Sequence, residues 1–344
     1  MTTIKQLAAL AGVSPTTVTN VIHGRYHKVR EETLRKVQRV IKETGYVPNM
    51  GGRLLNKCDS RLICVLITWS RRDEQNVAKD PFFGEIIGSL EREIRSHGYF
   101  MMLYISENAE ECIRMAKSWQ VDGLIVLGCM ADDSAYFMRH TFIPLVFIDT
   151  YFHDDGLPYV NVGLEDRRGA YLITEYLIQK GHRSIAFLAN NGKPPQGIDR
   201  ERLTGYRDAL REHGLPIDED DYLLISHRAD ERRAFLRDFV HTRMKKYTAL
   251  FFSSDFYAVD AIVTLYDEGV RVPEDISICG FDGNIFATQC RPQLTTVKQP
   301  VLGKAVCAVS MLLSLIRQET PSQRNTRLDV SLVIGNSVKD LRVP

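Results

Sequence analysis

The sequence has no long hydrophobic run and no export signal. No apolar stretch approaches the roughly 20 residues that a membrane-spanning helix requires. The N-terminus, MTTIKQLAALAGVS, lacks the basic start, apolar segment and cleavage site of a signal peptide. These absences predict a chain that has no membrane partner and stays in the cytoplasm.

CxxC pairs, the HExxH metal motif and catalytic motifs are also missing. The seven cysteines include no CxxC pair, and the nine histidines form no HExxH. An odd number of scattered cysteines is typical of reduced, mostly buried thiols. No GxGxxG follows a strand-like run, and neither GxxxxGK[ST] nor GxSxG occurs. We therefore expect no disulfide, no metal, no cofactor and no enzymatic activity.

The composition is that of a globular protein with an uneven distribution of charge. The 344 residues are 44% hydrophobic and 25% charged, which favours two or three packed folding units over disorder. Residues 1–60 hold ten Lys/Arg and four Asp/Glu, whereas the remainder holds 34 basic and 39 acidic residues. A basic N-terminal module on a slightly acidic body indicates a polyanionic partner for that module.

Two short helices joined by a tight turn are predicted at the N-terminus. Thr3 and Gln6 have the spacing of a capping box, and Gly12 suits the turn. Ser14 can then cap a second helix, in whose first turn Pro15 is well tolerated.

The second helix has an apolar face and a polar face. Val18, Val21 and Ile22 form the apolar face, and the remaining positions are short polar groups that can reach base edges or phosphates: Thr16, Thr17, Thr19 and Asn20. A third helix is predicted over residues 30–44. This pattern is typical of a helix-turn-helix that reads DNA with its second helix. We predict a DNA-binding domain over 1–47 and a Gly-containing linker over 48–59 that has no structure on its own.

From Arg61 onward, β-rich apolar runs alternate with amphipathic segments. LICVLIT, FFGEIIGSLEREIRSHG, YFMMLYIS and GLIVLG give the order of a parallel α/β sheet, and the pattern starts again after Asp149. We predict a core over 60–344 made of two doubly wound lobes with a cleft between them. A final helix near 301–318 and a final strand near 328–334 should return to opposite lobes. The expected division is an N-lobe of about 60–160 and 292–322 and a C-lobe of about 161–291 and 323–344.

Seven segments, in this order, resemble the lactose-repressor (LacI) family over nearly the whole chain. They are TIKQLAALAGVSPTTVTNVIHG, GYVPNMGGRLL, DPFFGEIIGSLEREIRSHGY, GHRSIAFLA, RERLTGYRDAL, GVRVPEDISICGFDG and LTTVKQP. The resemblance implies an all-α DNA headpiece, a hinge helix and a core similar to periplasmic sugar-binding proteins. It also implies a repressor that binds a near-palindromic operator on double-stranded DNA as a homodimer. A small-molecule effector, a sugar or sugar derivative, would control its operator affinity.

The resemblance assigns DNA contacts by position. Pro15 stands where the family has a polar side chain, so it can touch a thymine methyl group but donates no hydrogen bond to a base. Leu55 matches the leucine that enters the minor groove and kinks the operator, although an apolar linker residue is the alternative. The implied DNA-binding residues are Thr3, Ser14, Pro15, Thr16, Thr17, Thr19, Asn20, Arg53, Leu55 and Asn56.

The resemblance also implies an effector site, whose members are Phe82, Phe83, Asp149, Arg202, Ser254, Asp255, Phe256 and Asp282. Simpler roles remain open for some of them: packing of a helix start for one phenylalanine, a solvated helix face for Arg202, and a helix cap for Asp255. Ser254 stands where the family has Asn, and no aromatic residue lies between residues 226 and 232. The platform for a sugar is therefore incomplete, and the identity of the effector does not follow.

Three other functions compete with this interpretation. A solute-binding transport protein shares the core fold, but the missing export signal and the basic N-terminus argue against it. An enzyme has only the fold in its favour, because the catalytic motifs are absent. A regulator controlled by a protein co-effector remains open.

Overall fold

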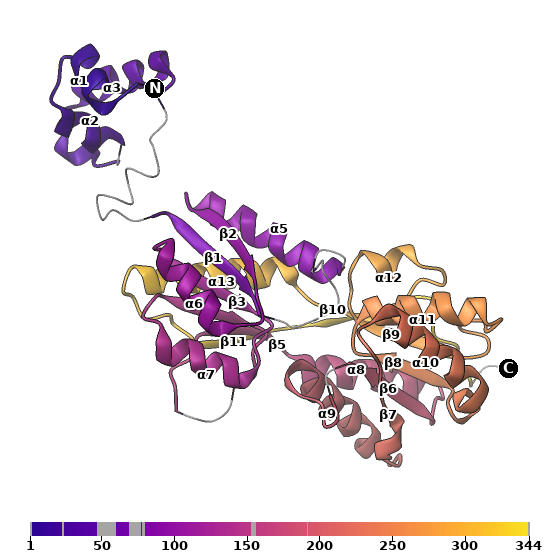
Figure 1. The fold of residues 1–344 in the computed structure, drawn as a ribbon. Helices are drawn as coiled ribbons and strands as arrows, with labels where there is room; N and C mark the ends of the chain where they lie inside the picture. Colours follow the sequence, from indigo (N-terminus) through magenta and orange to yellow (C-terminus); the bar gives the residue numbers. More distant parts are fainter. Residues whose placement is uncertain are drawn as a thin grey trace. The chain divides into compact units, whose positions relative to one another are not determined.

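The computed structural model describes residues 2–22, 24–46, 60–68, 77, 80–152, 156–190 and 192–342. The chain forms two compact units, Met1–Ser60 and Arg61–Pro344 (Figure 1). The linker predicted over 48–59 lies outside the described residues.

The N-terminal unit is the expected helix-turn-helix followed by a third helix. Its elements are α1 (Ile4–Ala11), α2 (Pro15–Ile22), η1 (Tyr26–Lys28) and α3 (Glu31–Thr44). Thr3 and Gln6 form the predicted capping box, with the Thr3 backbone N–H donating to the Gln6 side chain at 2.8 Å. Gly12 ends α1 at a φ of 61°, which a glycine adopts without strain. One buried cluster joins the three α-helices: Leu7, Ala8, Ala11, Val18, Val21 and Val37.

The first lobe of the core, the N-lobe, contains a six-stranded parallel sheet of order β11-β5-β4-β3-β1-β2. The strands are β1 (Leu62–Ile67), β2 (Phe100–Ile105), β3 (Gly123–Leu127), β4 (Leu145–Ile148), β5 (Asn161–Leu164) and β11 (Asn325–Leu328). Helices cover both faces, with α5 and α13 packed over one and α6 and α7 over the other. These helices are α5 (Pro81–Ser96), α6 (Ala109–Ser118), α7 (Ala131–His140) and α13 (Val301–Ile316).

The second lobe, the C-lobe, repeats this architecture with strand order β12-β10-β9-β8-β6-β7, in which only β12 is antiparallel to its neighbour. Its strands are β6 (Ile185–Ala189), β7 (Tyr222–Leu224), β8 (Ala249–Phe252), β9 (Ser277–Asp282), β10 (Thr295–Lys298) and β12 (Ser331–Val333). Helices α8 and α9 cover one face and α10 and α11 the other. The helices of the lobe are α8 (Asp166–Gln179), α9 (Gly197–Glu212), η3 (Glu219–Asp221), α10 (Ala229–Thr242), η4 (Met244–Lys246), α11 (Asp255–Asp267) and α12 (Ile285–Gln289).

The lobe boundaries differ from the expected ones by one strand at each crossing. Strand β5 pairs with β4, and β11 pairs with β5, so both belong to the N-lobe sheet. Strand β10 pairs with β9 in the C-lobe sheet. The division predicted at 160/161, 291/292 and 322/323 was therefore wrong, because each strand completes a sheet ladder before the chain crosses. The final helix α13 and the final strand β12 do return to opposite lobes, as predicted.

The chain crosses between the lobes three times. The crossings follow β5, β10 and β11, at Glu165, at Gln299 and Pro300, and at Asp329 and Val330. Three short connections at one place form a hinge that joins the two sheets (Figure 1).

None of the helices in the described part of the chain is long and apolar enough to span a bilayer.

Candidate functional site

The second helix of the headpiece presents only part of its polar face. The Ser14 hydroxyl accepts a hydrogen bond from the Thr17 backbone N–H at 3.1 Å and shares another with the Thr17 hydroxyl at 2.9 Å. The Thr19 hydroxyl donates to the Pro15 carbonyl at 2.9 Å. Pro15 is exposed and both threonines are partly buried. Hydroxyls engaged within their own helix must exchange those bonds to reach a base.

Thr16 and Asn20 are the remaining predicted contacts on this helix. Thr16 is exposed and Asn20 is half-buried, and Thr3 is exposed where it caps α1. Arg53, Leu55 and Asn56 lie outside the described residues, so their assignment to the hinge stays a prediction.

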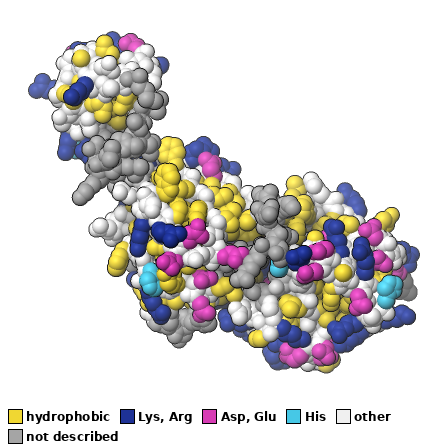
Figure 2. Space-filling view, in the orientation of Figure 1, with side chains coloured by type: hydrophobic (Ala, Val, Ile, Leu, Met, Phe, Trp, Pro, Cys, Tyr) yellow, Lys and Arg dark blue, Asp and Glu magenta, His cyan; other side chains and the backbone are white. Residues whose placement is uncertain are grey.

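Positive charge surrounds these helices. Eight Lys and Arg side chains of the described headpiece are exposed: Lys5, Arg25, Lys28, Arg30, Arg35, Lys36, Arg39 and Lys42. Figure 2 shows Lys and Arg side chains at several points on one face of the headpiece. Only three exposed carboxylates accompany them in the described headpiece: Glu31, Glu32 and Glu43. This excess of positive charge suits the phosphate backbone of a nucleic acid.

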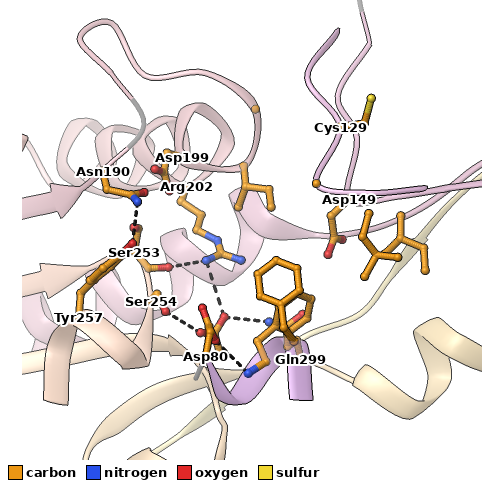
Figure 3. A pocket seen from close by; sticks show the side chains of 18 of the residues that line it. Asp80, Cys129, Asp149, Asn190, Asp199, Arg202, Ser253, Ser254, Tyr257 and Gln299 are labelled. Atoms are coloured by element: carbon orange, nitrogen blue, oxygen red, sulfur yellow. Dashed lines mark hydrogen bonds and ion pairs between the residues drawn. The ribbon is translucent and has the colours of Figure 1, made fainter. Parts of the chain in front are cut away.

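A pocket lies in the cleft between the two lobes of the core (Figure 3). It holds about 910 Å³ of empty space, its solvent-open mouth included. Its walls come mainly from the carboxyl ends of strands β3, β4, β6, β8 and β9, together with the first turns of α5, α9 and α11. This edge is where open parallel sheets bind ligands.

Six of the eight predicted effector residues line this pocket: Phe82, Phe83, Asp149, Arg202, Ser254 and Asp282. The two phenylalanine rings meet edge to face, with centroids 5.4 Å apart. Phe83 also packs in the N-lobe core at 3% exposure, so it combines both roles proposed for it from the sequence.

Asp255 and Phe256 do not line the pocket, which corrects their assignment. Asp255 is fully buried and accepts hydrogen bonds from the backbone N–H groups of Gly283 and Asn284, at 2.7 and 3.1 Å. It therefore fixes the turn that follows β9. Phe256 stacks on Phe286 within the C-lobe, with ring centroids 6.4 Å apart.

Arg202 is a buried residue of the cleft wall, at 5% exposure, and not a solvated side chain of a helix face. Its Nε donates to Asp166 at 2.8 Å, and its Nη1 donates to the backbone carbonyl of Ser253. The guanidinium group lies over the Phe281 ring, 3.6 Å from the centroid. These contacts hold the planar fork in one orientation, 3.9 Å from Asp282.

Asp282 is held in a backbone conformation that few non-glycine residues adopt, with a φ of 133°. Its carboxylate accepts hydrogen bonds from the Ser254 hydroxyl and the Gln299 amide, each at 2.8 Å. Burial and the neighbouring charge of Asp255 raise the pKa of Asp282 well above its usual value, against the opposing effect of Arg202.

Several pocket residues have no counterpart in the prediction from the sequence: Asp80, Asn190, Asp199, Tyr257 and Gln299. Tyr257 brings an aromatic ring from α11 and accepts a hydrogen bond from the Asn190 amide at 2.6 Å. It supplies apolar surface that the segment between residues 226 and 232 lacks. Cys129 also lines the pocket, and burial raises the pKa of its thiol, which therefore stays protonated and is a poor nucleophile.

The geometry thus defines a helix-turn-helix DNA-binding regulator with a two-lobed ligand-binding core. The chain matches two family models, "Bacterial regulatory proteins, lacI family" over residues 3–49 and "Periplasmic binding protein-like domain" over residues 174–338. It is 33% identical to the HTH-type transcriptional repressor PurR of Vibrio parahaemolyticus serotype O3:K6, over 99% of this chain and 100% of that protein. The chain belongs to the lacI family of bacterial regulatory proteins.

Solved structures of similar fold cover nearly the whole chain. The transcriptional regulator CelR in complex with cellobiose has a TM-score of 0.71 and 27% identity, over 98% of this chain and 100% of that one. The lac repressor dimer bound to operator and the anti-inducer ONPF has a TM-score of 0.81 and 24% identity, over 98% and 99%. The latter similarity is one of fold.

Proposed function

We propose that this protein represses transcription as a cytoplasmic homodimer on a near-palindromic operator, and that a sugar or sugar derivative in the interlobe pocket changes its operator affinity. The observation that carries the proposal is a pocket walled by residues from both lobes, in a chain that begins with a helix-turn-helix. The CelR complex with cellobiose and the lac repressor dimer on its operator support both parts.

In this proposal the second helix of the headpiece reads base edges and the surrounding cations bind phosphates. Pro15, Thr16 and Asn20 face the major groove, and Ser14, Thr17 and Thr19 contact the backbone beside them. Leu55 enters the minor groove at the operator centre, flanked by Arg53 and Asn56.

The effector acts by binding one orientation of the lobes better than another. Phe82, Phe83 and Asp149 approach it from the N-lobe, and Arg202, Ser254 and Asp282 approach it from the C-lobe. A ligand that touches both sides can shift the lobe equilibrium by its differential affinity, and no further. Binding alone, without a chemical step, accounts for this control.

The test is operator binding with and without candidate effectors. DNA from upstream of the protein's own gene should be bound in preference to unrelated DNA, with an affinity that falls steeply as salt rises. Addition of the cognate sugar should change that affinity by about tenfold or more, a typical allosteric coupling. Equal affinity for operator and unrelated DNA at every salt concentration would refute the proposal.

A further inference from the structure

One fully buried lysine lies in the most apolar helix of the core. Helix α13 reads VLGKAVCAVSMLLSLI, and Lys304 is its only charged residue, at 0% exposure. Its ammonium donates to Asp149 Oδ2 at 2.6 Å and to Gln299 Oε1 at 2.7 Å, and it lies 5.0 Å from the centroid of the Phe82 ring. A buried ammonium is costly unless it is paired, and these contacts supply its partners.

The same contacts form a continuous polar chain across the cleft. Asp149 follows β4 in the N-lobe, and Asp282 ends β9 in the C-lobe. Gln299, on a crossing between the lobes, accepts from Lys304 with its oxygen and donates to Asp282 Oδ1 with its nitrogen, at 2.8 Å. Strands β4 and β9 occupy the third place of their respective sheets, and both aspartates have positive φ values, 55° and 133°. The chain thus joins equivalent strand ends of the two lobes.

One carboxylate oxygen of Asp149 is available to accept a hydrogen bond from a ligand. Its Oδ2 is held by Lys304, whereas its Oδ1 is buried and has no hydrogen-bond partner among the described residues. The residue is 9% exposed and lines the pocket (Figure 3). A buried acceptor without a partner is rare in proteins, so a donor from a bound ligand is the natural complement.

Carboxyl groups outnumber cations among the described residues that line the pocket. The carboxyl groups belong to Asp80, Asp149, Asp199 and Asp282, and the cation is Arg202. The guanidinium group of that arginine is already paired with Asp166, and the ammonium of Lys304 is paired with Asp149. A phosphate or carboxylate of a ligand would therefore meet no cation of the described lining that is not already engaged.

We propose that Lys304 is a positioning residue that fixes Asp149 and, through Gln299, Asp282, so that the pocket takes a hydroxyl-rich or amine-bearing ligand without negative charge and rejects phosphorylated sugars. This inference rests on the proposed function and narrows its effector class. The positioning role depends on the lysine's charge as well as on its volume.

The role of the Lys304 charge is tested by measuring the melting temperature of the full-length protein at several pH values. The proteins compared are wild type, Lys304→Met and Lys304→Met/Asp149→Asn. Burial raises the pKa of Asp149 and Lys304 opposes that rise, so the single variant raises this pKa further. A carboxyl whose pKa is higher in the folded state adds stability at low pH that is lost as pH rises. The single variant should therefore melt only slightly below wild type at pH 5 and on the order of 10 °C below it at pH 8.

Other charged groups facing Asp149 are common to these proteins and cancel in the difference. The charged groups are Asp166 on α8 and Arg202 on α9, and the neutral hydroxyl of Tyr151 after β4 is also unchanged among them. The double variant, which has no carboxyl at position 149, should show no such slope. Arg232→Met is the matched control, because Arg232 is equally buried but its partner Asp260 keeps a second bond, from Arg233 at 2.8 Å. It should lower the melting temperature equally at both pH values.

The positioning role would be overturned if Lys304→Met lowered the melting temperature by the same amount at pH 5 and pH 8. It would also be overturned if the pH dependence of this loss persisted in the double variant.

The ligand class is tested at pH 7 with matched pairs, D-ribose with D-ribose 5-phosphate and D-glucose with D-glucose 6-phosphate. Any thermal stabilisation of wild type should be stronger for the uncharged member of a pair. A phosphate ester that stabilises wild type at lower concentration than its parent sugar would refute that class. Operator binding by wild type, measured alongside, separates either failure from failure of the proposed function.

Discussion

Asp255 and Asp282 show how two aspartates of one network acquire different roles. Asp282 ends β9 and faces the pocket. Asp255 opens α11 and is sealed beneath the turn after β9, where the Thr296 hydroxyl also donates to it at 2.5 Å. Gly280 makes this possible, because a Cβ there would lie 2.3 Å from Asp255 Oδ1. A carboxylate that orders a turn positions the pocket without entering it.

The burial of Asp255 should affect how the stability of the folded protein depends on pH. Burial raises its pKa from 3.8 to about 6, despite the hydrogen bonds that it accepts. Because the folded-state value is the higher one, the stabilising contribution of the protonated form is complete below pH 4 and is lost as pH rises to about 6. The Asp255→Asn variant lacks this titrating carboxyl, so its melting temperature should fall less between pH 4 and pH 7 than that of wild type. Asp275→Asn, at an exposed pair with Arg271, should leave the fall between pH 4 and 7 in place.

In the headpiece, Asn20→Ala should relax the choice of base within each half-site. Loss of one specific side-chain contact to a base costs about 1–3 kcal/mol of discrimination. The measurement is competition binding against operators with single base changes, with Gln38→Ala on the exposed side of α3 as the control. Unaltered preference at every operator position in Asn20→Ala would show that this side chain does not read DNA.

Residue type and position in the sequence predicted most of the expected pocket residues. The remaining residues were decided by how deeply each side chain is buried and by which way it points. The strand ends at Asp149 and Asp282 could be located because apolar runs mark buried strands. Position in the sequence does not show which way a side chain points: Asp255 and Phe256 follow the pocket residue Ser254, yet neither lines the pocket. A lone lysine in an apolar helix is a readable signal, yet its partner Asp149 is 155 residues away.

At the scale of elements, the contact between α8 and α9 sets the position of the arginine in the pocket wall. A Cβ on Gly205 of α9 would lie 1.9 Å from the backbone carbonyl oxygen of Arg167 on α8. The two helices are therefore closer than any side chain would allow. Arg202, one turn earlier on α9, bonds to Asp166 at the start of α8 across this contact.

Gly205→Ala should force these helices apart and weaken both stability and effector binding. Overpacking of this kind typically costs about 1–3 kcal/mol. Gly88→Ala on α5 is the matched control, because a Cβ there meets no atom within 4 Å, and it should be neutral or slightly stabilising. Denaturant unfolding of both variants checks the difference. Equal stability of the two would mean that the α8–α9 contact relaxes without cost.

Helices and strands were predicted well in kind, whereas their assignment to lobes was wrong at the crossings. Alternation of apolar and amphipathic segments identifies each element locally. The sheet that a strand joins depends on which neighbour pairs with it, and for β11 that neighbour, β5, is more than 150 residues earlier. No local pattern records such a pairing.

At the scale of the molecule, control requires that a signal in the cleft reach the DNA. Asp282→Asn keeps the shape of the side chain and an oxygen that accepts from Gln299, whereas the second oxygen becomes an amide that donates to the Ser254 hydroxyl. A ligand then loses one acceptor oxygen in the pocket. The effector concentration for half-maximal response should rise by about 10- to 100-fold, since a buried donor left without its acceptor costs about 1–3 kcal/mol. The readout is operator occupancy against effector concentration, scaled to each variant's own affinity without effector. A half-maximal concentration equal to that of wild type would remove Asp282 from the ligand site.

Assembly is the second property of the whole molecule. A single headpiece with a two-turn reading helix makes few base contacts, so specific binding should require two headpieces on related half-sites. Sedimentation at operator-binding concentrations should give a dimer, and an operator cut to one half-site should lose most of its affinity. A monomer that binds the full operator specifically would contradict this expectation.

The three crossings also determine when the lobes can finish folding during synthesis. The sheet that begins at residue 62 lacks the covering helix α13 until residue 316 has been made and the edge strand β11 until residue 328, while the other sheet lacks β12 until residues 331–333. Until then, apolar side chains of β1, β3 and α5 that α13 later covers remain open to water and to other nascent chains. A chain released before α13 has been made therefore has two unfinished sheets, and the apolar surface that it exposes is of the kind that chaperones and proteases recognise.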